Sequence, residues 1–156
     1  PVLLHTVNDI ERIGDHAVNI VEIAERKIEQ KIAFTDQALA ETDQLKAIVL
    51  KMCDQAVVAL AENDSESARA ALSNESILNR MQVELRRSHV MRMSEVKCSP
   101  EAGLIFIDLV DNVEKIGDHL ANIAQAVIGG LQWDGIELKL HRESGSHSEE
   151  TEGDIS

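Results

Sequence analysis

Two short stretches of this sequence carry nearly the same acidic residues. Residues 11–20 read ERIGDHAVNI and residues 114–123 read EKIGDHLANI; they are identical at seven of ten positions and lie 103 positions apart. Each stretch holds a glutamate and an aspartate four residues apart, a spacing that places both carboxylates on one face of a helix. Because like charges at this spacing repel each other mildly, a nearby cation would stabilise each pair.

Further side-chain oxygens extend both pairs along their helix faces. Rows of carboxylate and amide oxygens suit hard cations such as magnesium, manganese or iron. An alternative is that basic residues such as Arg12 and Lys115, or others on a neighbouring helix, neutralise the acids as ordinary ion pairs. The candidate metal ligands are Glu11, Asp15, Glu114, Asp118, Asn8 and Asp111.

A glycine and a histidine also recur in both copies. Gly14 and Gly117 lie inside predicted helices, where glycine costs about 1 kcal/mol relative to alanine, so they indicate close approach of another helix or space for a ligand. His16 and His119 follow their glutamates by five positions and point away from them, unlike the Glu-x-x-His ligands of di-iron bundles. We expect each histidine to lie at a helix contact or to pair with an acid.

The elements that position these residues are four long helices, each with apolar residues every three or four positions. The first spans about residues 2–32, with an apolar stripe that runs from Leu3 through Ile13 and Ile20 to Ile28. Thr35 or Thr42 caps the second helix and Asn63 or Asp64 caps the third, which ends near residue 94. Ser99, Pro100 and Glu101 start the fourth helix, which ends at Gly129 and Gly130.

The composition supports an all-α fold, an antiparallel helical bundle of four long helices. Apolar residues make up 44% of 156 residues but aromatic residues only 2%, so the core is aliphatic, as in helix bundles. We expect one helical domain over residues 1–130 and an acidic, disordered tail over residues 131–156.

The charge of the chain excludes several classes of partner. A net charge of −13 argues against nucleic acid and anionic membrane surfaces, and no apolar run is long enough for direct membrane insertion. Two cysteines without disulfide spacing indicate a reducing, cytoplasmic location. Because no motif for nucleophilic catalysis or phosphate binding is present, we predict no catalytic residues and no enzyme.

At the repeated motif the sequence resembles a known family. NDIERIGDHAVNI and DNVEKIGDHLANIAQAV resemble the signature of PhoU-type phosphate-uptake regulators, over about residues 1–128. The resemblance implies tandem three-helix repeats: the last three helices form one repeat, and the first helix is similar to the last helix of a preceding repeat. It also implies that the acidic motifs hold iron or zinc clusters.

One stretch departs from the family pattern. The family places a second Glu-x-x-x-Asp on the middle helix of each repeat, whereas this chain reads QVELR there, with Gln82 and Arg86 in place of the two acids. An arginine aimed at the site would neutralise the carboxylates instead of a metal. Pairing of Arg86 with Glu114 or Asp118 is therefore the direct alternative to metal binding.

Two longer stretches indicate which group of PhoU-like proteins the sequence resembles most. ELRRSHVMRM and KCSPEAGLIFIDLVDNVEKIGDH are similar to the PhoU-like region at the cytoplasmic C-terminus of bacterial sodium/phosphate cotransporter-like proteins. This implies a regulatory or tethering module at the inner face of the plasma membrane, with a membrane transporter domain in the same full-length chain. The alternatives are a stand-alone PhoU-type regulator or a metal-dependent carboxylate-bundle enzyme. The long first helix needs a partner for its apolar stripe, so we expect a homo-oligomer, most simply a dimer.

Overall fold

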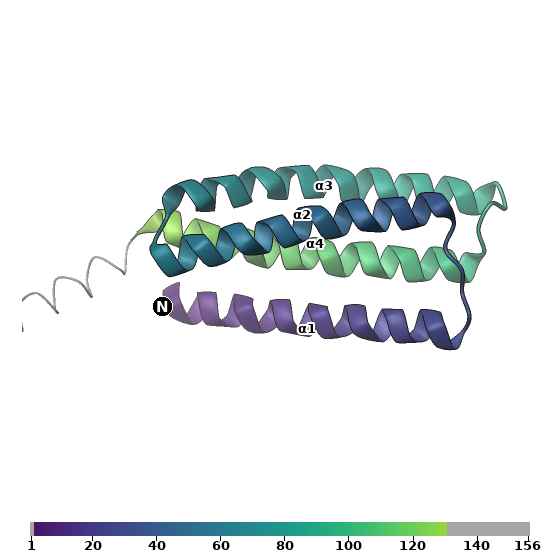
Figure 1. Cartoon of the computed structure of the whole chain (residues 1–156), viewed down its shortest axis with the longest axis horizontal. Coiled ribbons are helices and arrows are strands. Elements are labelled where there is room, and N and C mark those ends of the chain that lie inside the picture. Colours follow the sequence, from purple (N-terminus) through teal and green to yellow (C-terminus); the bar gives the residue numbers. More distant parts are fainter. Residues whose placement is uncertain (1, 131–156) are drawn as a thin grey trace, which may run out of the picture.

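The computed structural model describes residues 2–130, which form four antiparallel helices (Figure 1). The helices are α1 (Val2–Glu29), α2 (Asp36–Glu62), α3 (Ser65–Ser94) and α4 (Pro100–Gly129). The predicted all-α bundle is confirmed, although the first helix ends three residues earlier than expected. The predicted tail, residues 131–156, lies outside the described residues. Within residues 2–130, no helix combines the length and apolar character needed to cross a bilayer.

Local capping contacts explain where the helices begin and end. The side chain of Thr35 accepts a hydrogen bond from the Ala38 amide at 3.2 Å, so Thr35, and not Thr42, caps α2. Asp64 caps α3 by accepting from two backbone amides, and Ser99 caps α4 directly before a proline. Gly130 ends α4 in the left-handed region, with φ at 61°.

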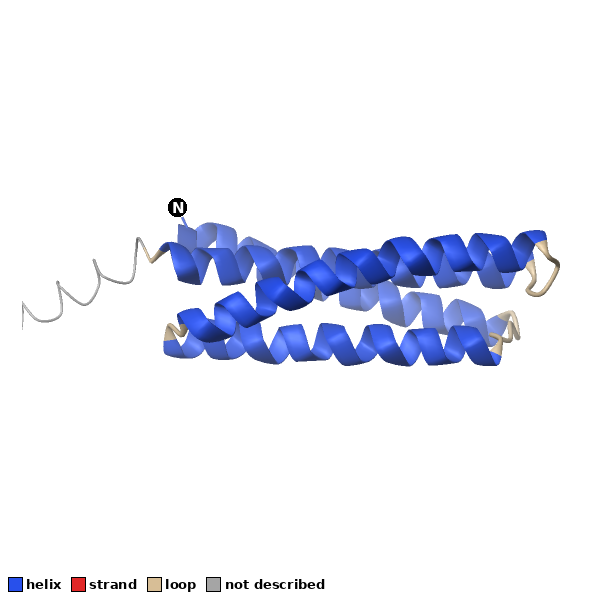
Figure 2. Ribbon diagram, turned by 90° about the horizontal axis from the view of Figure 1, so that it is seen from above, coloured by secondary structure: helices blue, strands red, loops and turns tan. Residues whose placement is uncertain are grey.

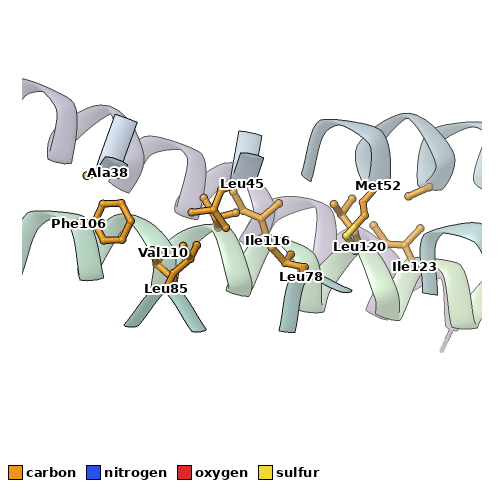
Figure 3. Close-up of a cluster of buried hydrophobic side chains, with 12 residues drawn as sticks. Ala38, Leu45, Met52, Leu78, Leu85, Phe106, Val110, Ile116, Leu120 and Ile123 are labelled. Atoms are coloured by element: carbon orange, nitrogen blue, oxygen red, sulfur yellow. The ribbon is translucent and has the colours of Figure 1, made fainter. Parts of the chain in front are cut away.

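Helix α4 lies at the centre of the arrangement. It packs against α2 and α3 on one side and against α1 on the other, whereas α1 packs against no described helix except α4 (Figures 1 and 2). The main core fills the space between α2, α3 and α4 (Figure 3). Its buried members are Ala38, Leu45, Met52, Ala56, Leu78, Leu85, Phe106, Val110, Val113, Ile116, Leu120 and Ile123.

The two repeated glycines have different surroundings. At Gly117 the side chains of Leu78 and Met52 pack directly against the helix backbone, and an added Cβ would clash with Leu78. Close helix approach is therefore confirmed there. At Gly14 no described atom lies within 4 Å of an added Cβ, so the same expectation is wrong for α1 within the described part of the chain.

The apolar residues of α1 divide between two sides of the helix. Ile13, Ile20 and Ile23 pack toward α4, and the first two are the stripe residues predicted to be buried. Leu3 and Ile28, which were predicted to belong to the same stripe, are more than half exposed. A single neighbouring helix covers only a narrow arc of α1, so the rest of the predicted stripe faces outward.

Candidate functional site

The acidic row on α4 lies beside α3, and an arginine reaches it. Arg86 donates from Nε to Oδ1 of Asp111 at 2.9 Å and also forms an ion pair with the same oxygen through Nη2. This hydrogen bond, helped by the charges of Asp111 and Glu114, raises the pKa of the Arg86 guanidinium above its ordinary value. Sequence reasoning correctly identified Arg86 as the competing cation but assigned it to the wrong carboxylates.

The two carboxylates of the Glu-x-x-x-Asp motif on α4 have a different partner. Lys115 Nζ lies 3.2 Å from Asp118 and 3.5 Å from Glu114. Hydrogen bonding to Asp118 and the charge of Glu114 raise the pKa of Lys115. Lys115 therefore makes the ion pairs that were given as the alternative to metal binding, and all three acids of the α4 row have a basic neighbour.

The equivalent row on α1 stands apart from the one on α4. Asn8, Glu11 and Asp15 are exposed, and no described residue from another helix forms an ion pair with Glu11 or Asp15. Within residues 2–130 no group of three or more acidic, histidine or cysteine side chains is arranged to hold a metal ion. The six predicted ligands thus form two separate rows.

The repeated motif does create one shared structure, the contact between α1 and α4. His16 Nδ1 donates to Oδ1 of Asn112 at 2.9 Å, and His119 Nδ1 donates to Oδ1 of Asp9 at 2.8 Å. The predicted histidine contacts are thereby confirmed.

The contact is reciprocal because each partner has an equivalent 103 positions away. Asp9 corresponds to Asn112, and His16 corresponds to His119, so the two histidine contacts are the same contact made in both directions. Asn19 and Asn122 also donate reciprocally, to Asn112 and Asp9. The two imidazole rings stack with their centroids 5.8 Å apart. The motif therefore builds an internal two-fold contact, comparable to the isologous interface of a dimer.

A second cluster was not predicted from the sequence. Near the end of the bundle where α2 and α4 begin, Arg92 forms a two-pronged ion pair with Glu41 at 2.8 and 2.6 Å, and both residues are buried. Arg92 Nη2 also contacts Nδ1 of His89 at 2.7 Å, and His89 stacks on Phe106 at 4.4 Å. A signal was present, because Arg92 follows Leu78 and Leu85 at intervals of seven, in the buried stripe of α3.

The proton of His89 can be placed from its neighbours. A guanidinium only donates hydrogen bonds, so Nδ1 of His89 accepts from Arg92 and the ring proton lies on Nε2. That nitrogen faces the Cys98 sulfur at 3.8 Å. Burial of the ring, together with the positive charge of Arg92, lowers the pKa of His89, while Glu41 opposes the shift. The folded protein therefore favours neutral His89.

This shift predicts a specific pH dependence. Since the pKa of His89 is lower in the folded state than the ordinary value near 6.5, stability is fully present above about pH 6.5 and is lost as the pH falls toward the folded-state pKa. Urea unfolding of the His89→Gln variant should show a shallower loss of stability between about pH 7 and 5 than the unchanged chain. The exposed His5→Gln variant is the control, and it should keep the original slope. Equal slopes in all three proteins would contradict this interpretation.

Comparison with known proteins assigns the family. The PhoU domain pattern matches residues 1–24 and 42–127, which include both copies of the repeated motif. The chain belongs to the PhoU domain family. Over 126 residues it is 32% identical to the phosphate-specific transport system accessory protein PhoU homolog 1 of Thermotoga maritima, which covers 81% of this chain and 53% of that protein.

A solved structure agrees with this assignment. The crystal structure of PhoU from Pseudomonas aeruginosa superimposes with a TM-score of 0.73 at 29% identity, over 79% of this chain and 58% of that one. The curated PhoU homolog of Pseudomonas aeruginosa is 29% identical over 123 residues, covering 79% of this chain and 50% of that protein. The chain thus spans about half the length of the curated relatives it matches.

Proposed function

We propose that this chain is a regulatory module of phosphate uptake that has no catalytic activity of its own and acts on a membrane transporter from the cytoplasmic side. The observation that carries the proposal is the PhoU domain match across both copies of the repeated motif. The Thermotoga and Pseudomonas relatives are named as accessory proteins of a phosphate-specific transport system. These names support the stand-alone type of regulator, and the link to a sodium/phosphate cotransporter stays a prediction.

Uptake of labelled phosphate tests this proposal. In a bacterium from which the PhoU gene has been deleted, expression of this chain should return the rate of phosphate uptake toward that of the parent strain. A double variant, Asp9→Ala with His119→Ala, removes one of the two histidine contacts between α1 and α4 and should restore uptake less well at equal expression. Uptake that stays at the deletion level with the unchanged chain would contradict the proposal.

The metal clusters implied by the family resemblance do not fit the α4 residues. Arg86 and Lys115 already neutralise Asp111, Glu114 and Asp118, and a metal would have to displace both cations. On α1, the exposed row of oxygens comes from one helix only. We infer that ion pairs take the place of metal on α4 of this chain.

A metal titration distinguishes ion pairing from metal binding. A metal that prefers the folded state raises the melting temperature, so Mn²⁺, Fe³⁺ or Zn²⁺ should leave the melting temperature of the unchanged chain where it is. The Arg86→Ala variant frees Asp111, and it should be the first variant to gain a thermal response to these ions. The exposed neighbour Arg87→Ala is the matched control and should show no response. A rise of several degrees in the unchanged chain would overturn the inference.

A further inference from the structure

The two cysteines of the chain lie in different surroundings. Cys53, in the middle of α2, is half-buried, and its burial together with the charge of Asp54 raises the pKa of its thiol. Cys98 directly precedes Ser99, the N-cap of α4, and lines a cavity of about 610 Å³. Since the thiolate is the reactive form of cysteine, Cys53 is held in its unreactive form, whereas Cys98 lies beside space for a ligand.

A buried histidine is aimed at the Cys98 sulfur. His89 is 1% exposed, and its Nε2 lies 3.8 Å from Sγ of Cys98. Within residues 2–130 this nitrogen has no other hydrogen-bond partner. Because Arg92 donates to Nδ1 of the same ring, the proton on Nε2 points at the sulfur. A hydrogen bond donated to a charged group stabilises its charged form, so His89 is placed to stabilise negative charge on Cys98.

The cavity beside Cys98 lies where two connections approach each other at one end of the bundle (Figure 1). One wall is the α1–α2 connection, residues 30–35, and the other is the α3–α4 connection, residues 97–99. Its volume falls within the range of about 300–1,000 Å³ that is typical of small-molecule sites. The thiol is therefore placed for reaction with a bound molecule, whereas a small oxidant such as peroxide needs no cavity of this size.

The charges around the cavity indicate the sign of that molecule. Lys31 and Lys97 line it together with one acid, Glu101. Lys97 also forms an ion pair with Glu95 at 2.7 Å, whereas no described residue forms an ion pair with Lys31. Lys31 is therefore the cation that is available to a ligand, and it favours one that carries carboxylates.

We propose that Cys98 is a modification site, which forms a mixed disulfide with a small anionic disulfide of the glutathione type bound in this cavity. The site lies apart from the repeated motif, and the proposal goes beyond the proposed function.

The reaction is a thiol–disulfide exchange. The Cys98 thiol loses its proton to solvent, because the His89 nitrogen that faces it already carries one. The thiolate attacks one sulfur of the bound disulfide: a bond forms between that sulfur and Sγ, the disulfide bond of the ligand breaks, and its other half leaves as a thiolate that takes up a proton. The Cys98 sulfur is oxidised, and the leaving sulfur is reduced.

Oxidised glutathione tests the proposal, with Cys53 as the control in the same molecule. Trypsin cleaves after Lys51 and Lys97, so the two cysteines fall on different peptides, and mass spectrometry gives the rate of adduct formation at each. In the folded chain at neutral pH we expect Cys98 to react about tenfold or more faster than Cys53. In concentrated urea the two rates should become similar, because both sets of surroundings are lost.

Variants separate the roles of the histidine and the cavity. His89→Leu removes the donor and should slow the reaction of Cys98 about tenfold, whereas His89→Gln, whose amide also donates, should slow it less. Lys31→Glu should slow the reaction with oxidised glutathione severalfold but not the reaction with cystamine, a disulfide that carries two amines. Lys46→Glu, an exposed lysine on α2, is the matched control and should change neither rate. Circular dichroism checks that each variant is folded.

Either of two results would overturn the proposal. In the first, Cys98 reacts no faster than Cys53 in the folded chain, or folded His89→Leu leaves the Cys98 rate unchanged; the contact with His89 is then packing only. In the second, cystamine modifies Cys98 faster than oxidised glutathione does, and Lys31→Glu has no effect; the cavity then does not select an anionic disulfide. If His89→Leu does not fold, the comparison of the two cysteines and the Lys31→Glu variant decide.

Discussion

Helix α4 has to be covered on two opposite sides, and the other three helices are arranged around that constraint. On one side it buries aliphatic residues against α2 and α3, and each such side chain contributes about 1.5–3 kcal/mol when it is fully buried. On the other side it meets α1 through a few isoleucines and a row of polar contacts. The apolar side supplies most of the stabilisation. The polar side determines the axial register in which α1 packs against α4.

The polar contact between α1 and α4 gives a physical reason for the repeated motif. A two-fold contact requires that each helix present equivalent donors and acceptors. His16 therefore pairs with Asn112 in the same way that His119 pairs with Asp9. The histidines and asparagines of the motif are used in this contact. The glutamates and aspartates of the motif lie beside this contact: Glu114 and Asp118 meet Lys115 on α4, whereas Glu11 and Asp15 are exposed on α1.

Much of the fold could be predicted from local sequence signals. Thr35, Asp64, Ser99 and Gly130 act through contacts within a few residues, so the helix boundaries follow from short-range chemistry. The covered side of α1 could not be predicted, because apolar residues lie on two of its sides and periodicity does not tell which side meets a neighbour.

The parts of the candidate site that were missed depend on contacts between helices. Arg86 pairs with Asp111 and not with Glu114 or Asp118, although all three lie on α4 within two turns. The choice depends on how α3 and α4 align along their axes, which no local sequence signal encodes. The buried cluster of Glu41, His89 and Arg92 combines residues from α2 and α3 that are 51 positions apart at the ion pair. No sequence spacing encodes such a pair.

The central claim is that a reciprocal polar contact holds α1 against α4, and a double-mutant cycle on Asp9 and His119 tests it most directly. Unfolding free energies would be measured for the unchanged chain, Asp9→Ala, His119→Ala and the double variant. The account predicts a coupling energy of about 0.5–3 kcal/mol, as found for residues in contact. A parallel cycle on Asp9 and Arg87, an exposed residue of α3, which does not pack against α1, should be additive. Additivity within about 0.3 kcal/mol for Asp9 and His119 would contradict the account.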